Sequence, residues 1–286
     1  MPIYKSKVLE NYILIEFQKG EDKTAERVLE RDDYWRKMKE DCWRAPYSME
    51  RASFARDFCR NPQKYLEITS NEEILRAKRK RQLYEVLEEQ EIEYFVHFTN
   101  AKNLENIFKY GLLSVRDMKN KEIEFIHNDE ERLDNKLGAI CLSVSFPNYR
   151  MFSKYRYSSE CDWVVLLIAP KQILELNCKF CVTNAASRKM RRRISINPAF
   201  DFKNMFSENM LTKSREMSRL PKNFTTDPQA EILVMDSIPI NAIQGVCFQN
   251  EDALMKYNYL LQDRRIKIYV DETYFDKRID HMYWGN

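Results

Sequence analysis

A glutamine and a glutamate lie two positions apart where an apolar run begins, in Gln229-Ala230-Glu231-Ile232-Leu233-Val234. Residues two apart on a strand face the same side, so we expect Gln229 and Glu231 to project together from a buried strand. A carboxylate placed there can stabilise a developing cation or accept a proton, and the amide can hydrogen-bond an acceptor group. A solvated strand end has the same residues, so the interpretation depends on the rest of the chain.

The elements that would position this pair alternate between strands and short helices from Glu91 onward. Apolar runs predict strands, and Gly111 is a residue type that commonly ends a helix. The predicted strands are 94–99, 139–146, 163–168, 231–234, 242–248 and 266–270. The predicted helices are 101–110 and 251–261, and a helix or turn is predicted over 148–157. This order predicts an α+β fold with a mixed or mainly antiparallel sheet. Residues 183–227 are expected to be irregular, with short helical pieces.

The chain before residue 90 is heavily charged and has helical spacing. We predict helices over 25–31, 34–39 and 48–58, with Ser48 as an N-cap, and another that starts at a capping box at Ser70. The basic run 76–81 is interpreted as a solvated helix face. The predicted domains are therefore a helical N-terminal extension over 1–90 and a catalytic domain over 91–286.

Composition excludes several classes of protein. The chain has 286 residues and a net charge of +3, so a surface for nucleic acid would have to be local. Its five glycines are scattered, which excludes the glycine-rich loops that cradle dinucleotides and phosphates. No signal peptide and no apolar run long enough for a membrane span is present. We expect a cytoplasmic protein without membrane contact.

Seven cysteines make an odd and scattered set, which favours reduced thiols over a disulfide framework. Cys178 and Cys181 have CxxC spacing, but no second pair of ligands follows them. We therefore predict no metal site.

Several motifs in a fixed order resemble the DarT family. His97-Phe98-Thr99 opens the set, Asn103-Leu104-Glu105-Asn106-Ile107 and Gly111-Leu112-Leu113-Ser114 follow, and the 229–234 strand closes it. The resemblance covers about residues 92–270. It implies an ADP-ribosyltransferase fold and a toxin that transfers ADP-ribose from NAD to bases of nucleic acid. It also implies a toxin–antitoxin or phage-defence setting and an antitoxin partner.

The resemblance assigns roles to individual residues. Glu231 is expected to stabilise the cation that forms when the nicotinamide–ribose bond breaks. Segment 143–152 resembles the region in which the family has a catalytic arginine. Arg150 is our assignment for that arginine, with Lys154 and Arg156 as alternatives. A single strand histidine is more often a core residue, and only the accompanying motifs favour a binding role here. The expected NAD-binding residues are His97, Thr99, Asn103, Ser143, Ser145 and Tyr149.

A basic run at residues 188–193 has five positive charges in six positions and precedes the predicted catalytic strand. Such a loop, with phenylalanines nearby, would suit a single strand of nucleic acid, although solvated charges over core aromatics explain the pattern equally well. The expected substrate-binding residues are Gln229, Arg188, Arg191, Arg192 and Arg193.

We predict an enzyme that modifies bases of single-stranded DNA. Bases in a duplex are inaccessible, and the sequence does not separate DNA from RNA, so mRNA is the alternative substrate. A catalytically idle nucleic-acid-binding module on the same scaffold is a second alternative. A protein-modifying transferase is a third, against which the basic run argues.

Overall fold

The computed structural model of the chain divides into two compact units, Met1–Lys78 and Arg79–Asn286. The structure describes residues 4–9, 11–17, 23–30, 35–39, 42–126, 138–158, 160–187, 190, 197–210, 213–262 and 265–283. Within these residues, no helix is long and apolar enough to cross a membrane.

The N-terminal unit is built on a four-stranded antiparallel sheet in the order β1-β2-β4-β3. Ile13, Ile15 and Phe17 alternate along one strand and are buried with apolar residues of two helices. The strands are β1 (Tyr4–Val8), β2 (Tyr12–Phe17), β3 (Arg36–Lys39) and β4 (Cys42–Pro46), and the helices are α1 (Lys23–Glu30) and α2 (Met49–Arg60). Helix α3 (Pro62–Glu89) begins in this unit, and its residues from Arg79 onward belong to the second unit.

The prediction that residues 1–90 are helical is wrong where these four strands lie. Strand β3 is exposed at all four positions and has three charged residues, so it lacks the period of two by which a strand is found in a sequence. The helix predicted over 34–39 is replaced by β3, and no helix begins at Ser70, because α3 already starts at Pro62. The α2 prediction is confirmed: the Ser48 hydroxyl accepts a hydrogen bond from the Arg51 amide at 3.1 Å.

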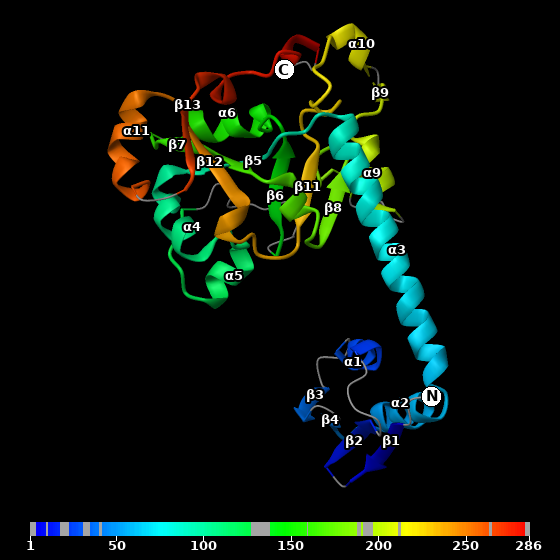
Figure 1. The fold of residues 1–286 in the computed structure, drawn as a ribbon. Coiled ribbons are helices and arrows are strands. Elements are labelled where there is room, and N and C mark those ends of the chain that lie inside the picture. The colour runs from blue at the N-terminus through cyan, green and yellow to red at the C-terminus, as the bar shows by residue number, and fades with distance from the viewer. Residues whose placement is uncertain are drawn as a thin grey trace. The chain divides into compact units, whose positions relative to one another are not determined.

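The second unit contains a seven-stranded sheet in the order β13-β12-β7-β5-β6-β11-β8 (Figure 1). All its pairs are antiparallel except β12 with β13, which confirms the predicted α+β class with a mixed sheet. The strands are β5 (Phe95–Asn100), β6 (Ile140–Val144), β7 (Trp163–Ile168), β8 (Cys178–Cys181), β11 (Glu231–Val234), β12 (Ile243–Phe248) and β13 (Lys267–Val270). Strand β7 is buried at all six positions, as its apolar sequence predicts.

Short helices and 3-10 turns connect these strands. They are η1 (Ala101–Asn103), α4 (Leu104–Tyr110), α5 (Val115–Asn120), α6 (Tyr149–Tyr157), α7 (Pro170–Ile173), α9 (Pro198–Asn204), α10 (Arg215–Ser218), η2 (Ile240–Ala242), α11 (Glu251–Tyr257), η3 (Asn258–Leu260), η4 (Glu272–Phe275) and η5 (His281–Tyr283). Strands β9 (Asn209–Met210) and β10 (Lys213–Ser214) form a separate two-stranded ribbon. The predicted helix stop at Gly111 is confirmed: its φ is 78°, and a Cβ there would lie 2.3 Å from the Ile238 carbonyl oxygen.

The strand β8 was missed, because its Cys-Lys-Phe-Cys sequence suggested only a ligand motif. Cys178 and Cys181 lie on this edge strand, which pairs with β11. Burial raises the pKa of the Cys178 thiol to about 12, which keeps this thiol protonated and poorly reactive at neutral pH.

Candidate active site

The sheet splits between β5 and β6. These two strands pair only at Phe95 with Val144 and at Val96 with Ser143. Beyond that point β5 continues along β7, whereas β6 continues along β11. Because each strand follows a different neighbour, the two separate from residue 97 onward.

His97 lies where the strands separate. Its Nδ1 is 2.9 Å from the carbonyl oxygen of Cys141 on β6, so the imidazole bridges the split through a side chain where backbone pairing has ended. A carbonyl oxygen can only accept a hydrogen bond, so Nδ1 carries the hydrogen in this contact. In that tautomer Nε2 has no hydrogen and can accept a hydrogen bond.

A cavity of about 230 Å³ opens beside this split. Its walls come from residues 96–99 of β5, residues 140–143 of β6, helix α4 and the segment from Leu112 to Ile126. The Glu231 side chain, at the N-terminal end of β11, also lines it and is only 7% exposed. Most of the lining is apolar, which is usual for a small-molecule site with a few placed polar groups.

One wall of the cavity is tied down by asparagines of the 3-10 turn η1 and helix α4. The Asn103 amide nitrogen donates to the Thr99 hydroxyl and to the Ile126 carbonyl, both at 3.0 Å, and its oxygen accepts from the Ile126 amide at 2.9 Å. Asn106 donates to the Glu124 carbonyl at 2.7 Å. These contacts hold residues 124–126 against the first strand of the predicted motif.

Five predicted site residues line the cavity together. They are His97, Thr99, Asn103, Ser143 and Glu231. Asn148 and Asn184 also line it and were not predicted. Asn148 donates its backbone N–H to the Ser143 hydroxyl at 3.2 Å and caps α6 with its side chain, and a helix-capping position is the only signal that the sequence contained for it.

Four predicted residues lie outside the cavity lining. Ser145 has a left-handed φ of 59°, and its buried hydroxyl has no hydrogen-bond partner among the residues that the structure describes. Tyr149 is buried. Its desolvation, and to a lesser extent the negative charge of Asp280, raise the pKa of the Tyr149 phenol. Arg150 is half-buried on α6, and Gln229 is half-buried in a turn.

The alternatives to Arg150 lie outside the cavity lining as well. Lys154 is exposed on α6. Arg156 donates to the Phe275 carbonyl and, at 2.9 Å, to the Gln249 side-chain oxygen, so its guanidinium anchors the segment after β13.

The strand-alternation argument for Gln229 and Glu231 is wrong. Strand β11 begins at Glu231, and Gln229 lies in the preceding turn, where its backbone N–H donates to the Asp227 carboxylate at 2.8 Å. Glu231 is buried, so it is not the solvated strand end that the sequence left open as the alternative. The basic run with Arg188, Arg191, Arg192 and Arg193 lies outside the described residues.

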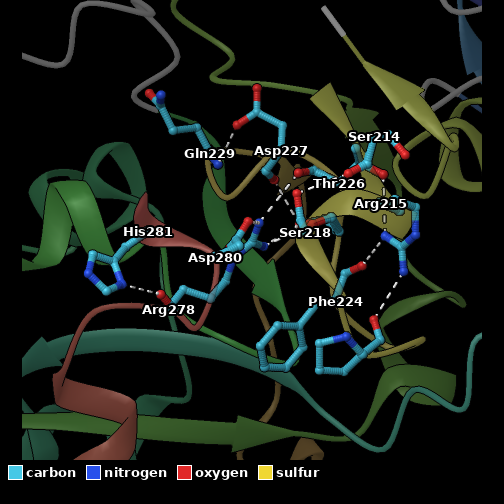
Figure 2. Close-up of polar contacts among 12 residues, drawn as sticks. Ser214, Arg215, Ser218, Phe224, Thr226, Asp227, Gln229, Arg278, Asp280 and His281 are labelled. Atoms are coloured by element: carbon cyan, nitrogen blue, oxygen red, sulfur yellow. Dashed lines mark hydrogen bonds and ion pairs between the residues drawn. The ribbon is translucent and has the colours of Figure 1, made fainter. Parts of the chain in front are cut away.

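The loop before β11 is held by two arginines, as Figure 2 shows. Arg215 donates to the carbonyls of Phe224 at 2.5 Å, Pro221 at 3.0 Å and Lys222 at 3.3 Å. Arg278 donates to the carbonyls of Thr225 and Thr226. We call residues 221–230 the approach loop, because they lead the chain into Glu231.

Comparison with known proteins identifies the class. Residues 96–276 match the family model described as "ssDNA thymidine ADP-ribosyltransferase, DarT", so the second unit is an ADP-ribosyltransferase domain. The chain belongs to the DarT family, which confirms the resemblance seen in the motifs from His97 to Val234.

Solved DarT structures resemble the chain at low identity. Thermus sp. 2.9 DarT in complex with ADP-ribosylated ssDNA is 14% identical with a TM-score of 0.48, over 65% of this chain and 97% of that one. The same protein in complex with NAD+ is 13% identical with a TM-score of 0.44, over 64% of this chain and 96% of that one. Thermosipho africanus DarTG in complex with ADP-ribose is 13% identical with a TM-score of 0.44. The match spans about half of that chain (51%) and 64% of this one. No curated protein matches the sequence.

Proposed function

We propose that this protein transfers ADP-ribose from NAD to thymine bases of single-stranded DNA. The observation that carries the proposal is the buried Glu231 carboxylate at the end of a cavity that His97, Thr99, Asn103 and Ser143 also line. Family membership supplies the reaction class, and the family description names the nucleoside.

In the proposed reaction the bond between nicotinamide and ribose breaks, and nicotinamide leaves with the bonding electrons. Positive charge then develops on the ribose, and the Glu231 carboxylate stabilises it in surroundings of low dielectric. A ring nitrogen of the base forms the new bond to the same carbon. Glu231 accepts the proton that this nitrogen loses.

The remaining site residues have binding roles in this proposal. NAD occupies the cavity, with His97, Thr99, Asn103 and Ser143 as hydrogen-bonding partners. Arg150 binds the pyrophosphate as a charged fork, and Ser145 and Tyr149 complete the cofactor side. Gln229 and the basic run Arg188, Arg191, Arg192 and Arg193 bind the DNA.

We propose further that the protein acts as a toxin with an antitoxin partner, in the cytoplasm, in a toxin–antitoxin or phage-defence setting. The name DarTG of one similar structure supports a paired arrangement. Expression of the wild-type chain should arrest growth of the host cell, and the Glu231→Gln chain should not. Growth arrest by both would separate toxicity from catalysis.

The direct test incubates the protein with NAD and synthetic oligonucleotides and measures the products by mass. Single-stranded DNA with one thymine should gain one ADP-ribose. Thymine-free DNA, the same DNA as a duplex, and an RNA of the same sequence with uracil for thymine should gain none. Modification of RNA alone would favour the mRNA alternative. Absence of any product with wild-type protein that binds NAD would favour the idle-module alternative.

A further inference from the structure

A buried ion pair lies near the C-terminal end of the chain, outside the cavity. Arg278 is 2% exposed and Asp280 is fully buried. The Arg278 Nε donates to Oδ1 of Asp280 and Nη2 donates to Oδ2, both at 2.6 Å, which makes a two-pronged, charge-assisted contact. The family match ends at residue 276, so both residues lie beyond it.

Arg278 uses all of its donors. A guanidinium has five N–H groups, and the three not directed at Asp280 point to the approach loop. Nη1 donates to the Thr225 carbonyl at 2.9 Å and to the Thr225 hydroxyl at 3.4 Å, and Nη2 donates to the Thr226 carbonyl at 3.4 Å. Asp280 therefore orients the guanidinium, and the guanidinium holds the loop.

Hydrogen bonds lead from this contact to the catalytic strand. The Thr225 hydroxyl donates to the Asp227 carbonyl at 2.8 Å, and the same carbonyl accepts from the Ala230 amide at 3.0 Å. The Asp227 carboxylate accepts from the Gln229 amide. The turn that sets the direction of Gln229 and Glu231 is thus fixed on Thr225, and Thr225 is fixed on Arg278.

Arg215 holds the same loop from its own helix, α10. It binds the carbonyls before Thr225 and reaches the Thr226 hydroxyl at 3.3 Å. Figure 2 shows Arg215 and Arg278 as separate anchors along the loop, with Phe224 between them. The Arg278 guanidinium carbon also lies 5.7 Å from the centre of the Phe224 ring.

Such a pair is better suited to fixing geometry than to adding stability. Buried ion pairs are costly to desolvate, and apolar residues often replace them without loss of stability. A planar fork between two carbonyls and a carboxylate restricts the loop in a way that apolar contacts do not. Small displacements of catalytic groups reduce rates strongly.

We propose that Arg278 and Asp280 are positioning residues, which hold the approach loop so that the base and Glu231 meet in the geometry for transfer. The proposal rests on the proposed function. In the proposed function NAD occupies the cavity, and no residue of the approach loop lines it, so the pair governs transfer to the base more than cleavage of NAD.

The test compares two reactions of the same full-length protein: transfer to single-stranded DNA, and hydrolysis of NAD with water as acceptor. Arg278→Lys keeps the charge and loses the fork. We expect transfer to fall about tenfold or more relative to hydrolysis, through kcat, with the stabilisation by NAD retained. Arg156→Lys is the control, because the half-buried Arg156 also donates to a backbone carbonyl of the C-terminal segment, at Phe275. An arginine that binds the pyrophosphate would serve both reactions equally, so the ratio of transfer to hydrolysis in Arg156→Lys should stay at the wild-type value even if Arg156 takes the role assigned to Arg150.

Two further measurements keep the proposal testable if Arg278→Lys folds poorly. Arg215 is half-buried and also holds the approach loop, so Arg215→Ala should lower the ratio of transfer to hydrolysis by a smaller factor. Amide hydrogen exchange at Thr226, Gln229 and Ala230 should accelerate in either variant and stay unchanged in Arg156→Lys.

Equal losses of transfer and hydrolysis, or a ratio in Arg278→Lys equal to that of Arg156→Lys, would overturn the positioning role and leave the proposed function intact. If the wild-type protein itself transfers nothing to DNA, the proposed function fails first, and the positioning role fails with it.

Discussion

The two sides of Glu231 are built differently. The cavity side consists mostly of apolar residues, and its few polar contacts come from neutral side chains: Asn103 binds Ile126, 23 positions away, and His97 contacts Cys141, 44 positions away. The approach loop is held by two arginines that donate to its backbone carbonyls: Arg215, which lies 6 to 9 positions from the carbonyls it binds, and Arg278, which lies 52 to 53 positions away. An apolar cavity can accept a cofactor by shape, whereas a loop that must present a carboxylate and a base at one angle needs directional bonds.

The largest expected effect is at Glu231, where the two sides meet. Glu231→Gln should lower both NAD hydrolysis and transfer by about 10²- to 10⁴-fold, because the neutral amide neither stabilises the developing cation nor accepts a proton. Gln keeps the size of this buried side chain, so the melting temperature should stay close to wild type. Substantial transfer by Glu231→Gln would contradict the central assignment.

The cavity wall can be tested with a matched pair of asparagines. Asn103→Ala should cost about 1–3 kcal/mol of unfolding free energy, because it removes three hydrogen bonds, one of them to the hydroxyl of the buried Thr99. It should also weaken the binding of NAD. Asn106→Ala is the control: it removes one exposed contact and should cost below about 1 kcal/mol. Chemical denaturation measures the loss of unfolding free energy, and NAD titration measures the loss of affinity. Equal losses in the two variants would show that Asn103 contributes no more to the cavity wall than Asn106.

Substitutions in the basic run at residues 188–193 test the proposed binding of DNA. The charges of this run exceed the acids nearby in the sequence, and each phosphate contact releases counterions. Arg191→Glu with Arg192→Glu should therefore flatten the dependence of log affinity on log salt by about two units. Hydrolysis of NAD should survive the change, because the cavity is formed elsewhere. An unchanged slope would make this run an ordinary solvated surface.

The smallest expected effect concerns His97. NAD at 100 times its Kd should stabilise the wild-type protein by about 2.7 kcal/mol, which a thermal shift measures. His97→Ala removes one hydrogen-bonding partner and the bridge to Cys141, so NAD affinity should fall about tenfold. A full thermal shift in His97→Ala would assign His97 to the core and remove it from the cofactor side.

Much of the second unit could be predicted from the sequence. The apolar run at 163–168, the helix stop at Gly111 and the motif around His97 are local patterns, and each occurs where it was expected. The N-terminal sheet was missed because short, charged strands such as β3 lack an apolar period and depend on their neighbours for pairing. Gln229 was misplaced because the start of a strand is decided by the turn before it.

The sequence by itself determined the family, the cavity residues His97, Thr99 and Asn103, and the carboxylate Glu231, because these belong to ordered motifs with a local period. Only the tertiary structure decided that Glu231 is buried, that β5 and β6 separate at His97, and that Arg278 holds Thr225. The last contact joins residues 53 positions apart. A hydrogen bond forms only when donor and acceptor lie about 3 Å apart and in line, and no spacing in a sequence specifies that distance between segments so far separated.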